Sequence, residues 1–216
     1  MINILLSRGI INIPNIYIYL KEYIKPHHKV LFVAFSFFEK DAKNATEYQE
    51  LTQNYLQRMK DSFFPYGIKE EQIDVLNYYN NNHDDAVKMI KEADIIYFPG
   101  GAPDAFMKRL SEFKITEILE KASDKIFIGS SAGTMIQFPM YHITPDKDYK
   151  VFSYQKGLGL IHNFMVEVHY KKRFKFKKSS KRVKDDYNLP IIIIPDSGCV
   201  ILDGDKRFFL GGARVF

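Results

Sequence analysis

Between residues 29 and 140, short apolar runs alternate with segments whose apolar residues recur at helical spacing. Residues 29–36 form a near-continuous apolar run, which is typical of a parallel strand buried on both faces. Residues 43–63 carry apolar side chains three and four positions apart, which predicts an amphipathic helix. Further strands are expected at 73–76, 94–98 and 125–128, and further helices at 84–93, 104–110 and 115–122. This alternation predicts a parallel sheet with helices on both faces.

The pattern changes toward the C-terminus. Residues 164–170 alternate between apolar and polar, like a half-exposed strand. Residues 191–194 are four consecutive isoleucines and predict a buried strand. Residues 199–202 and 207–210 flank the turn sequence Asp203-Gly204-Asp205, which predicts a C-terminal β-hairpin.

The N-terminal residues are apolar in two short stretches. Residues 2–6 are apolar and β-branched, whereas residues 16–20 fit either a strand or the start of a helix. Pro14, just before the second stretch, favours a short helix. The first nine residues have no leading basic region and no small-residue cleavage site, so we expect no signal peptide. No apolar run approaches the ~20 residues that span a bilayer.

The composition is that of an ordinary globular protein, with 46% hydrophobic and 26% charged residues. A length of 216 residues fits one α/β domain over residues 1–216 and is short for two. The single cysteine, Cys199, excludes an intrachain disulfide framework, and its apolar surroundings favour a packing role. We therefore expect a cytoplasmic protein.

The formal net charge of +5 arises from one segment. Nine of the 31 Lys and Arg residues lie in 171–184, which contains no acidic residue. The basic character is thus local, and nucleic acid is not an expected partner. Three interpretations of the segment stay open. Residues 171–189 can form a solvated mobile loop, or the basic residues can bind a phosphate-rich partner with Phe174 and Phe176 between them. In the third, Arg173 holds a substrate carboxylate.

The stretch Gly129-Ser130-Ser131-Ala132-Gly133 follows an apolar run and fits Gly-x-Ser-x-Gly with Ser131 at its centre. In that motif the serine sits on a sharp strand-to-helix turn, which exposes its hydroxyl and aims free helix N–H groups at the same point. A nucleophile and part of an oxyanion hole can therefore come from one turn. The alternative is an ordinary loop rich in small residues.

A second glycine turn, Gly100-Gly101, follows the expected strand at 94–98. Glycine there allows the backbone to approach a substrate closely and to present an N–H. In a hydrolase, this N–H would join that of Ala132 in binding the oxyanion. Without the serine motif, a tight turn before a helix explains the glycines equally well.

A serine nucleophile needs a base within hydrogen-bond reach and an acid that orients the base. His169 is the preferred base, because it ends a strand beside a loop, where sites collect in open α/β sheets. The other histidines are His27, His28, His83, His142 and His162. The candidate acids are Asp146, Asp148, Glu167 and Asp196, and each also fits a solvated turn carboxylate.

These motifs occur in an order that resembles one family. Pro-Gly-Gly after a strand, Gly-Ser-Ser-Ala-Gly, Gly-Leu-Gly-Leu at 157–160, Val-Glu-Val-His-Tyr at 166–170 and a late Ile-Pro-Asp resemble the peptidase E and cyanophycinase family of serine peptidases. The resemblance covers residues 29–216. It implies the flavodoxin-like fold of class I glutamine amidotransferases, a three-layer α/β/α sandwich.

The resemblance also implies roles for particular residues. Ser131 falls on the nucleophile, His169 on the base, and Gly101 and Ala132 on the oxyanion hole. The family spacing selects Asp146 as the acid, with Asp148 close behind. Arg173, four residues after His169, would hold a substrate carboxylate as a bidentate fork. Family members cleave peptide bonds next to aspartate, in Asp-X dipeptides or in cyanophycin.

Three hypotheses for the function follow. The first is a serine peptidase acting on a small peptide that can contain aspartate, without a cofactor or metal. The second is a non-catalytic binding protein on the same fold that uses residues 171–184 for an anionic partner. The third is an esterase or amidase with a non-peptide substrate. No membrane partner is expected, and a homodimer is left open.

Overall fold

The computed structural model describes all 216 residues and has a mostly parallel central sheet. Its parallel strands are β1 (Ile2–Leu6), β2 (Val30–Ala34), β3 (Ile73–Asn77), β4 (Ile95–Phe98) and β5 (Ile126–Ser130). β10 (Cys199–Asp203) and β11 (Lys206–Leu210) are antiparallel and form the expected C-terminal hairpin. The order across the sheet is β11-β10-β1-β5-β4-β2-β3, so the N-terminal strand β1 lies beside β5. The prediction of a mostly parallel α/β sheet is confirmed.

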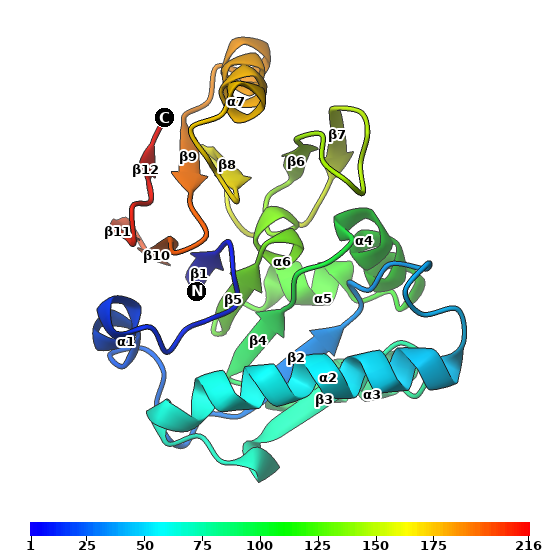
Figure 1. Cartoon of the computed structure of the whole chain (residues 1–216). Coiled ribbons are helices and arrows are strands. Elements are labelled where there is room, and N and C mark those ends of the chain that lie inside the picture. Colours follow the sequence, from blue (N-terminus) through cyan, green and yellow to red (C-terminus); the bar gives the residue numbers. More distant parts are fainter.

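Helices cover both faces of this sheet (Figure 1). α1 (Pro14–Leu20) and α2 (Ala45–Phe63) pack on one face, in a core of 24 buried residues. α3 (His83–Glu92), α4 (Pro103–Glu112) and α5 (Thr116–Lys121) pack on the opposite face, in a core of 31 buried residues. Successive residues of a strand point to opposite faces, so that Ile4 packs in one core and Leu5 in the other. The three layers of the predicted sandwich follow from this alternation.

Residues 140–194, together with the last strand of the chain, build a smaller layer beyond the carboxyl ends of the parallel strands (Figure 1). β6 (Met140–Ile143) and β7 (Ser153–Lys156) form an antiparallel ribbon. β8 (Met165–Val168) and β9 (Ile191–Ile194) are parallel neighbours, and β12 (Arg214–Val215) pairs antiparallel with β9. Because β8 and β9 are parallel, the residues that follow them emerge side by side.

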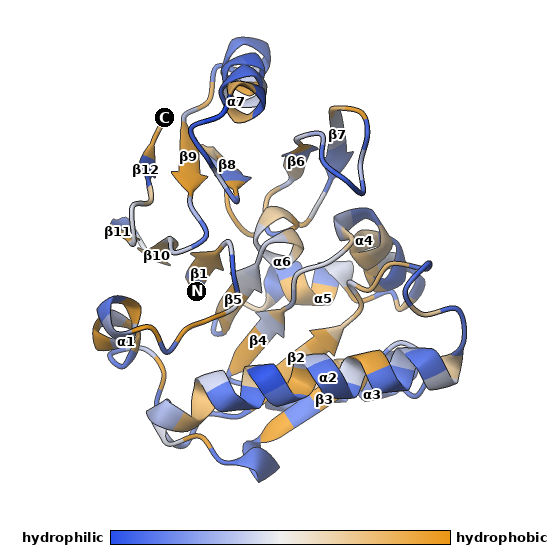
Figure 2. Ribbon diagram, viewed as in Figure 1, coloured by the Kyte–Doolittle hydropathy of each residue, from blue (hydrophilic) through white to orange (hydrophobic).

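The basic segment is a helix, α7 (Phe174–Tyr187), so its interpretation as a loop is wrong. The buried side chains of α7 are Phe176, Ser179, Ser180 and Val183, which share one face at helical spacing. Phe176 and Val183 pack against residues of β8 and β9, while most of the remaining surface of the helix is hydrophilic (Figure 2). Two serines on the buried face hide the apolar period in the sequence. None of the helices combines the length and apolar character needed to cross a membrane.

The glycines around Ser131 allow the close packing of β5 on the short helix α6 (Ala132–Met135). A Cβ added at Gly133 would lie 2.0 Å from the carbonyl oxygen of Phe98 on β4. A Cβ at Gly129 would lie 2.4 Å from the carbonyl oxygen of Gly133. Both contacts are with backbone atoms, which cannot rotate away. Neither position can therefore accept a side chain without moving the turn.

Replacing Gly133 with alanine is expected to lower the free energy of unfolding by about 1–3 kcal/mol, the usual cost of overpacking. Gly159→Ala is a matched control, because the nearest atom to its added Cβ is 3.8 Å away, an ordinary contact. Its unfolding free energy should stay within about 1 kcal/mol of wild type. Urea unfolding of the three proteins measures the difference. Equal stability of the two variants would contradict the packing argument.

Candidate active site

Ser131 lies on a strained turn between β5 and α6. Its backbone angles, φ 49° and ψ −110°, are unfavourable for a residue with a side chain. The turn is held by hydrogen bonds to β1: the Ser131 N–H donates to the Leu6 carbonyl at 2.8 Å. The buried Thr134 hydroxyl lies 2.7 Å from the carbonyl oxygens of both Leu6 and Gly129. Strain at one residue that its neighbours fix in this way is typical of functional sites.

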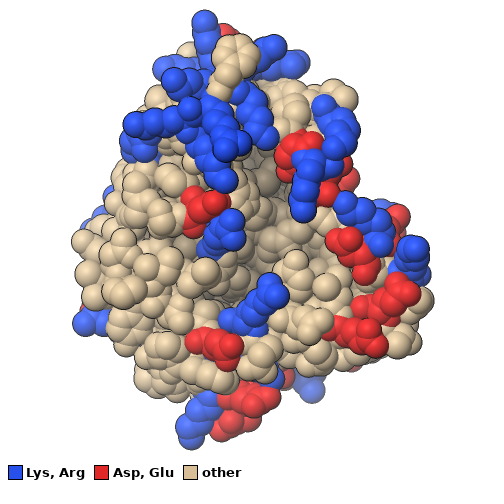
Figure 3. Space-filling view, viewed as in Figure 1, with Lys and Arg blue, Asp and Glu red and all other residues tan.

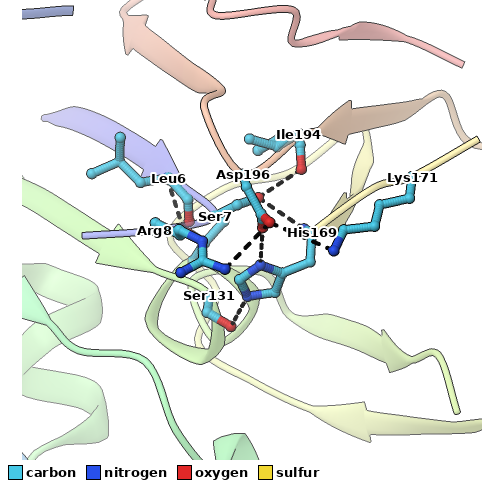
Figure 4. A network of polar contacts seen from close by, with 9 residues as sticks. Leu6, Ser7, Arg8, Ser131, His169, Lys171, Ile194 and Asp196 are labelled. Carbon is cyan, nitrogen blue, oxygen red and sulfur yellow. Dashed lines mark hydrogen bonds and ion pairs between the residues drawn. The ribbon is translucent and has the colours of Figure 1, made fainter. Parts of the chain in front are cut away.

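The Ser131 hydroxyl is hydrogen-bonded to His169 (Figure 4). Ser131 Oγ lies 2.8 Å from His169 Nε2, within the distance over which a base accepts the proton of a nucleophile. The other ring nitrogen, Nδ1, lies 2.6 Å from Asp196 Oδ1. A carboxylate only accepts hydrogen bonds, so Nδ1 carries the proton and Nε2 is free to accept one from Ser131. The order serine, imidazole, carboxylate is that of a hydrolytic triad.

Ser7 positions His169 relative to Ser131. The His169 N–H donates to Ser7 Oγ at 2.9 Å, and Ser7 Oγ donates to the Ile194 carbonyl at 2.6 Å (Figure 4). Ser7 follows β1, His169 follows β8, and Ile194 ends β9. The buried Ser7 hydroxyl thus joins the central sheet to the smaller one. His169 itself has φ 54°, so the chain turns sharply where the imidazole must face the serine.

The Asp196 carboxylate has basic neighbours in addition to His169. Arg8 Nη2 lies 3.4 Å and Lys171 Nζ 3.8 Å from Asp196 Oδ2. Desolvation alone would raise the pKa of Asp196, but the hydrogen bonds and positive charges of His169 and Arg8 outweigh it. The pKa of Asp196 therefore lies below its ordinary value. Near neutral pH the carboxylate is ionised and can stabilise a protonated imidazole.

The backbone beside Ser131 offers hydrogen-bond donors. Gly101 has φ 145°, and an added Cβ would lie 2.1 Å from the Ser36 carbonyl oxygen, so only glycine fits. The adjacent Ala102 N–H donates to that oxygen at 2.6 Å, which fixes the turn. The N–H groups of Gly101 and Ala132 are donors in none of the loop or cap hydrogen bonds. Neither N–H group of the expected oxyanion hole is therefore engaged in a turn or a helix cap.

Ser131 lies between two cavities. One, of about 320 Å³, is bounded by Gly101, His169 and Glu167 and lies under α7. The other, of about 810 Å³, extends past Gly9 and Arg58 on the α2 side. Ser131, His169 and Arg8 border both cavities. A bound substrate can therefore have its scissile bond at Ser131 with a part in each cavity.

The structure does not bring Asp146 to His169, which corrects its expected position; the carboxylate that contacts the imidazole is that of Asp196. Asp146 Oδ1 accepts the N–H groups of Asp148 and Tyr149, both at 2.8 Å, and so stabilises a turn at the cavity wall. Asp148 forms an ion pair with Lys40. The reason is topological. Val168 pairs with Ile194 in adjacent parallel strands, so the residues just beyond them, His169 and Asp196, emerge together.

Glu167, the remaining candidate acid, also does not contact His169. Its carboxylate is buried at the base of the smaller cavity, where Oε2 lies 2.9 Å from His142 Nε2. His142 is therefore a site residue that sequence reasoning treated only as one histidine among six. No spacing signal joins these two residues, because they come from β8 and β6.

Arg173 is exposed at the N-terminal end of α7 and does not border the smaller cavity, which corrects its expected position. The basic residues that do border it are Arg8, Lys171 and Lys175. Figure 3 shows Lys and Arg side chains gathered over α7, above the hollow in this face. The position of Arg8 could have been predicted from the sequence, because Arg8 lies just beyond the apolar run 2–6, as His169 lies just beyond its strand.

Two solved structures are similar to the chain over its whole length. One is a proposed peptidase E protein from Listeria monocytogenes EGD-e, with a TM-score of 0.68 and 18% identity, covering 100% of this chain and 98% of the other. The second is a peptidase from an acI-B1 Actinobacterium, with a TM-score of 0.63 and 18% identity, covering 100% and 96%. At this identity the likeness establishes the fold. Among curated proteins, none matches the sequence.

The sequence itself matches a family model. The model of peptidase family S51 aligns with residues 19–210, which include Ser131, His169 and Asp196. This range holds every parallel strand of the central sheet except β1, together with the turn that carries Ser131 and the two strands that precede His169 and Asp196. The chain therefore belongs to peptidase family S51, the family of peptidase E.

Proposed function

We propose that the protein is a serine-type peptidase that cleaves a peptide bond in a small peptide through Ser131, His169 and Asp196. The observation that carries the proposal is the continuous hydrogen-bonded chain from Ser131 Oγ through both imidazole nitrogens to the Asp196 carboxylate. Membership of a peptidase family supports the hydrolysis of peptides rather than of other acyl compounds.

The proposed reaction has two halves. Ser131 Oγ attacks the substrate carbonyl carbon while its proton passes to His169 Nε2. The C–N bond then breaks, and His169 returns the proton to the leaving amine. In the second half, water attacks the acyl-serine ester and loses its proton to His169, which protonates Ser131 as the acid product leaves. Asp196 stays ionised and stabilises the imidazolium in both halves.

The N–H groups of Gly101 and Ala132 are proposed to bind the oxyanion that forms in each half. Preorganised backbone donors of this kind supply a large part of the rate enhancement in acyl transfer. Their position on two rigid turns suits this role, because neither has to move when the charge develops.

The smaller cavity supports a small substrate. A volume of about 320 Å³ holds a residue or two rather than a folded chain. Lys171 and Lys175 at its border suit an acidic group, which agrees with a peptide that contains aspartate. In this proposal Lys171 and Lys175 bind the substrate carboxylate that the sequence analysis assigned to Arg173.

A fluorophosphonate probe tests the proposal, because it reacts with activated serines irrespective of the natural substrate. Wild-type protein is expected to gain one adduct by intact mass, and Ser131→Ala none. Ser130→Ala is the matched control: Ser130 is the adjacent buried serine, and its loss should leave labelling in place. An unlabelled wild-type protein would support the alternative, a binding protein that uses the basic surface of α7.

A further inference from the structure

The proposed oxyanion-hole amide of Gly101 belongs to a peptide unit with a glycine on either side. Gly101 has φ 145°, and such a unit rotates easily because neither flanking residue has a side chain to hinder it. The C=O and N–H of a trans peptide point in opposite directions. Rotating the unit by half a turn would therefore replace the Gly101 N–H with the Gly100 carbonyl oxygen, which would repel an oxyanion. The proposed reaction thus requires a group that holds this peptide.

The hydroxyl of Ser36 holds the Gly100 end of the peptide. Ser36 lies just beyond β2, and its side chain is fully buried. Ser36 Oγ donates a hydrogen bond to the Gly100 carbonyl oxygen at 2.7 Å. No backbone N–H of a turn, loop or cap donates to that oxygen. Because the peptide is planar, fixing its carbonyl also fixes the direction of the Gly101 N–H.

The backbone of Ser36 holds the next peptide of the turn. The Ser36 carbonyl oxygen accepts the Ala102 N–H at 2.6 Å. Both peptide units that flank the Gly101 Cα are therefore hydrogen-bonded to the same residue. This is possible because β2 and β4 are paired parallel strands, so that the residues beyond their carboxyl ends lie next to each other.

Arg109 on α4 fixes the loop that carries Ser36. Its side chain is only 6% exposed, and Nη1 donates to the carbonyl oxygens of Phe35 and Phe37, both at 2.7 Å. The guanidinium carbon also lies 5.1 Å from the centre of the Tyr78 ring, within the range of a cation–π contact. The residues on either side of Ser36 are thus tied to α4, the helix that begins directly after the Gly101 turn.

We propose that Ser36 is a positioning residue for the reaction: its hydroxyl holds the Gly100–Gly101 peptide in the orientation that aims the Gly101 N–H at the oxyanion. This inference rests on the proposed function. Ser36 borders neither cavity at Ser131, so it acts through the peptide and not on the substrate. The hydrogen bond to the Gly100 carbonyl also polarises the peptide, which makes the Gly101 N–H a stronger donor.

The rate at which a fluorophosphonate labels Ser131 tests the proposal without a known substrate, because negative charge develops on the phosphonyl oxygen as the serine attacks. Ser36→Ala removes the hydroxyl but keeps the carbonyl that Ala102 bonds. It is expected to label about 10–100-fold more slowly than wild type, somewhat less than the loss of one oxyanion donor. Ser36→Cys, whose thiol fills similar space but donates weakly, should label at an intermediate rate, and it carries the test if the alanine variant is unstable.

Thr52→Ala is the matched control. Thr52 is fully buried, its Oγ1 donates to the Tyr48 carbonyl at 2.7 Å, and it borders neither cavity at Ser131. The variant thus loses a buried hydroxyl-to-carbonyl bond of the same length. Thermal melts of Ser36→Ala and Thr52→Ala should show comparable losses of stability, whereas Thr52→Ala should label at the wild-type rate.

Steady-state kinetics on a hydrolysed dipeptide separates positioning from general loosening of the site. Ser36→Ala is expected to lower kcat by about 10–100-fold and to leave KM within about twofold of wild type, because the oxyanion forms only in the transition state. A general loosening would raise KM as well, since it would also disturb substrate binding.

Three outcomes would overturn the inference while leaving the proposed function in place. The first is labelling of Ser36→Ala and Ser36→Cys at the wild-type rate. The second is an equal loss of labelling in Thr52→Ala, and the third is a raised KM with unchanged kcat in Ser36→Ala. If wild-type protein itself is not labelled at Ser131, the proposed function fails, and the role of Ser36 fails with it.

Discussion

Ser131→Ala is expected to lower kcat/KM for a hydrolysed peptide by about 10⁶-fold, the effect of removing the nucleophile of a serine hydrolase. The variant should fold normally, because alanine keeps the backbone hydrogen bond from residue 131 to Leu6. Hydrolysis of a panel of Asp-X and other dipeptides, followed by release of the free amine, measures the loss. A thermal melt of each protein checks that the fold is intact.

The companion experiment combines this variant with His169→Ala. Ser131 and His169 act as one unit if the Oγ–Nε2 hydrogen bond transfers the proton. Losing both should therefore cost about as much as losing either one. Additive losses in the double variant, or wild-type turnover by Ser131→Ala, would contradict the proposed mechanism.

Asp196→Asn is expected to lower kcat by about 10⁴-fold, as a wrong imidazole tautomer does in other triads. The amide NH₂ of asparagine can donate to Nδ1, which would place the ring proton on Nε2. The imidazole could then no longer accept the Ser131 proton. Asp146→Asn is the matched control, because Asp146 caps a turn at the cavity wall and does not reach His169. Its kcat should stay within about tenfold of wild type.

Opposite changes in kcat are expected if Asp196 or Asp146 is the acid of the triad. Steady-state kinetics of the two variants on the same peptides therefore decides between these residues. A large loss in Asp146→Asn together with near wild-type kcat in Asp196→Asn would restore the choice made from family spacing. It would also mean that the loop at 144–150 moves onto His169 when a substrate binds.

Much of the fold can be predicted from the sequence, because each element of the central sheet buries a continuous apolar surface. The apolar runs at β2 and β5 reflect strands that are covered on both faces. The helical spacing of apolar residues in α2 reflects the one face that this helix buries on the sheet. The sequence did not predict the helix α7, because its buried face includes Ser179 and Ser180, which interrupt the apolar spacing of Phe176 and Val183. Tertiary contact, not local preference, decides that segment.

The residues of the candidate site could be predicted from the sequence where they follow strands. Ser131 and His169 each come directly after a strand, and the structure brings their side chains into contact. Asp196 follows its strand after one intervening residue. What the sequence lacks is the pairing of β8 with β9, which sets the acid beside the base. The hydrogen bonds by which Ser7 joins the two sheets also cannot be predicted from the sequence.

The hydroxyl of Ser131, and not that of its neighbour Ser130, is the proposed nucleophile. Ser131 Oγ contacts His169, whereas Ser130 is buried at the end of β5. The most direct test is tandem mass spectrometry of the labelled peptide that contains both serines, after reaction with a fluorophosphonate. The predicted result is that fragment masses assign the phosphonate to Ser131 alone. A phosphonate on Ser130 or on any other residue would contradict the account.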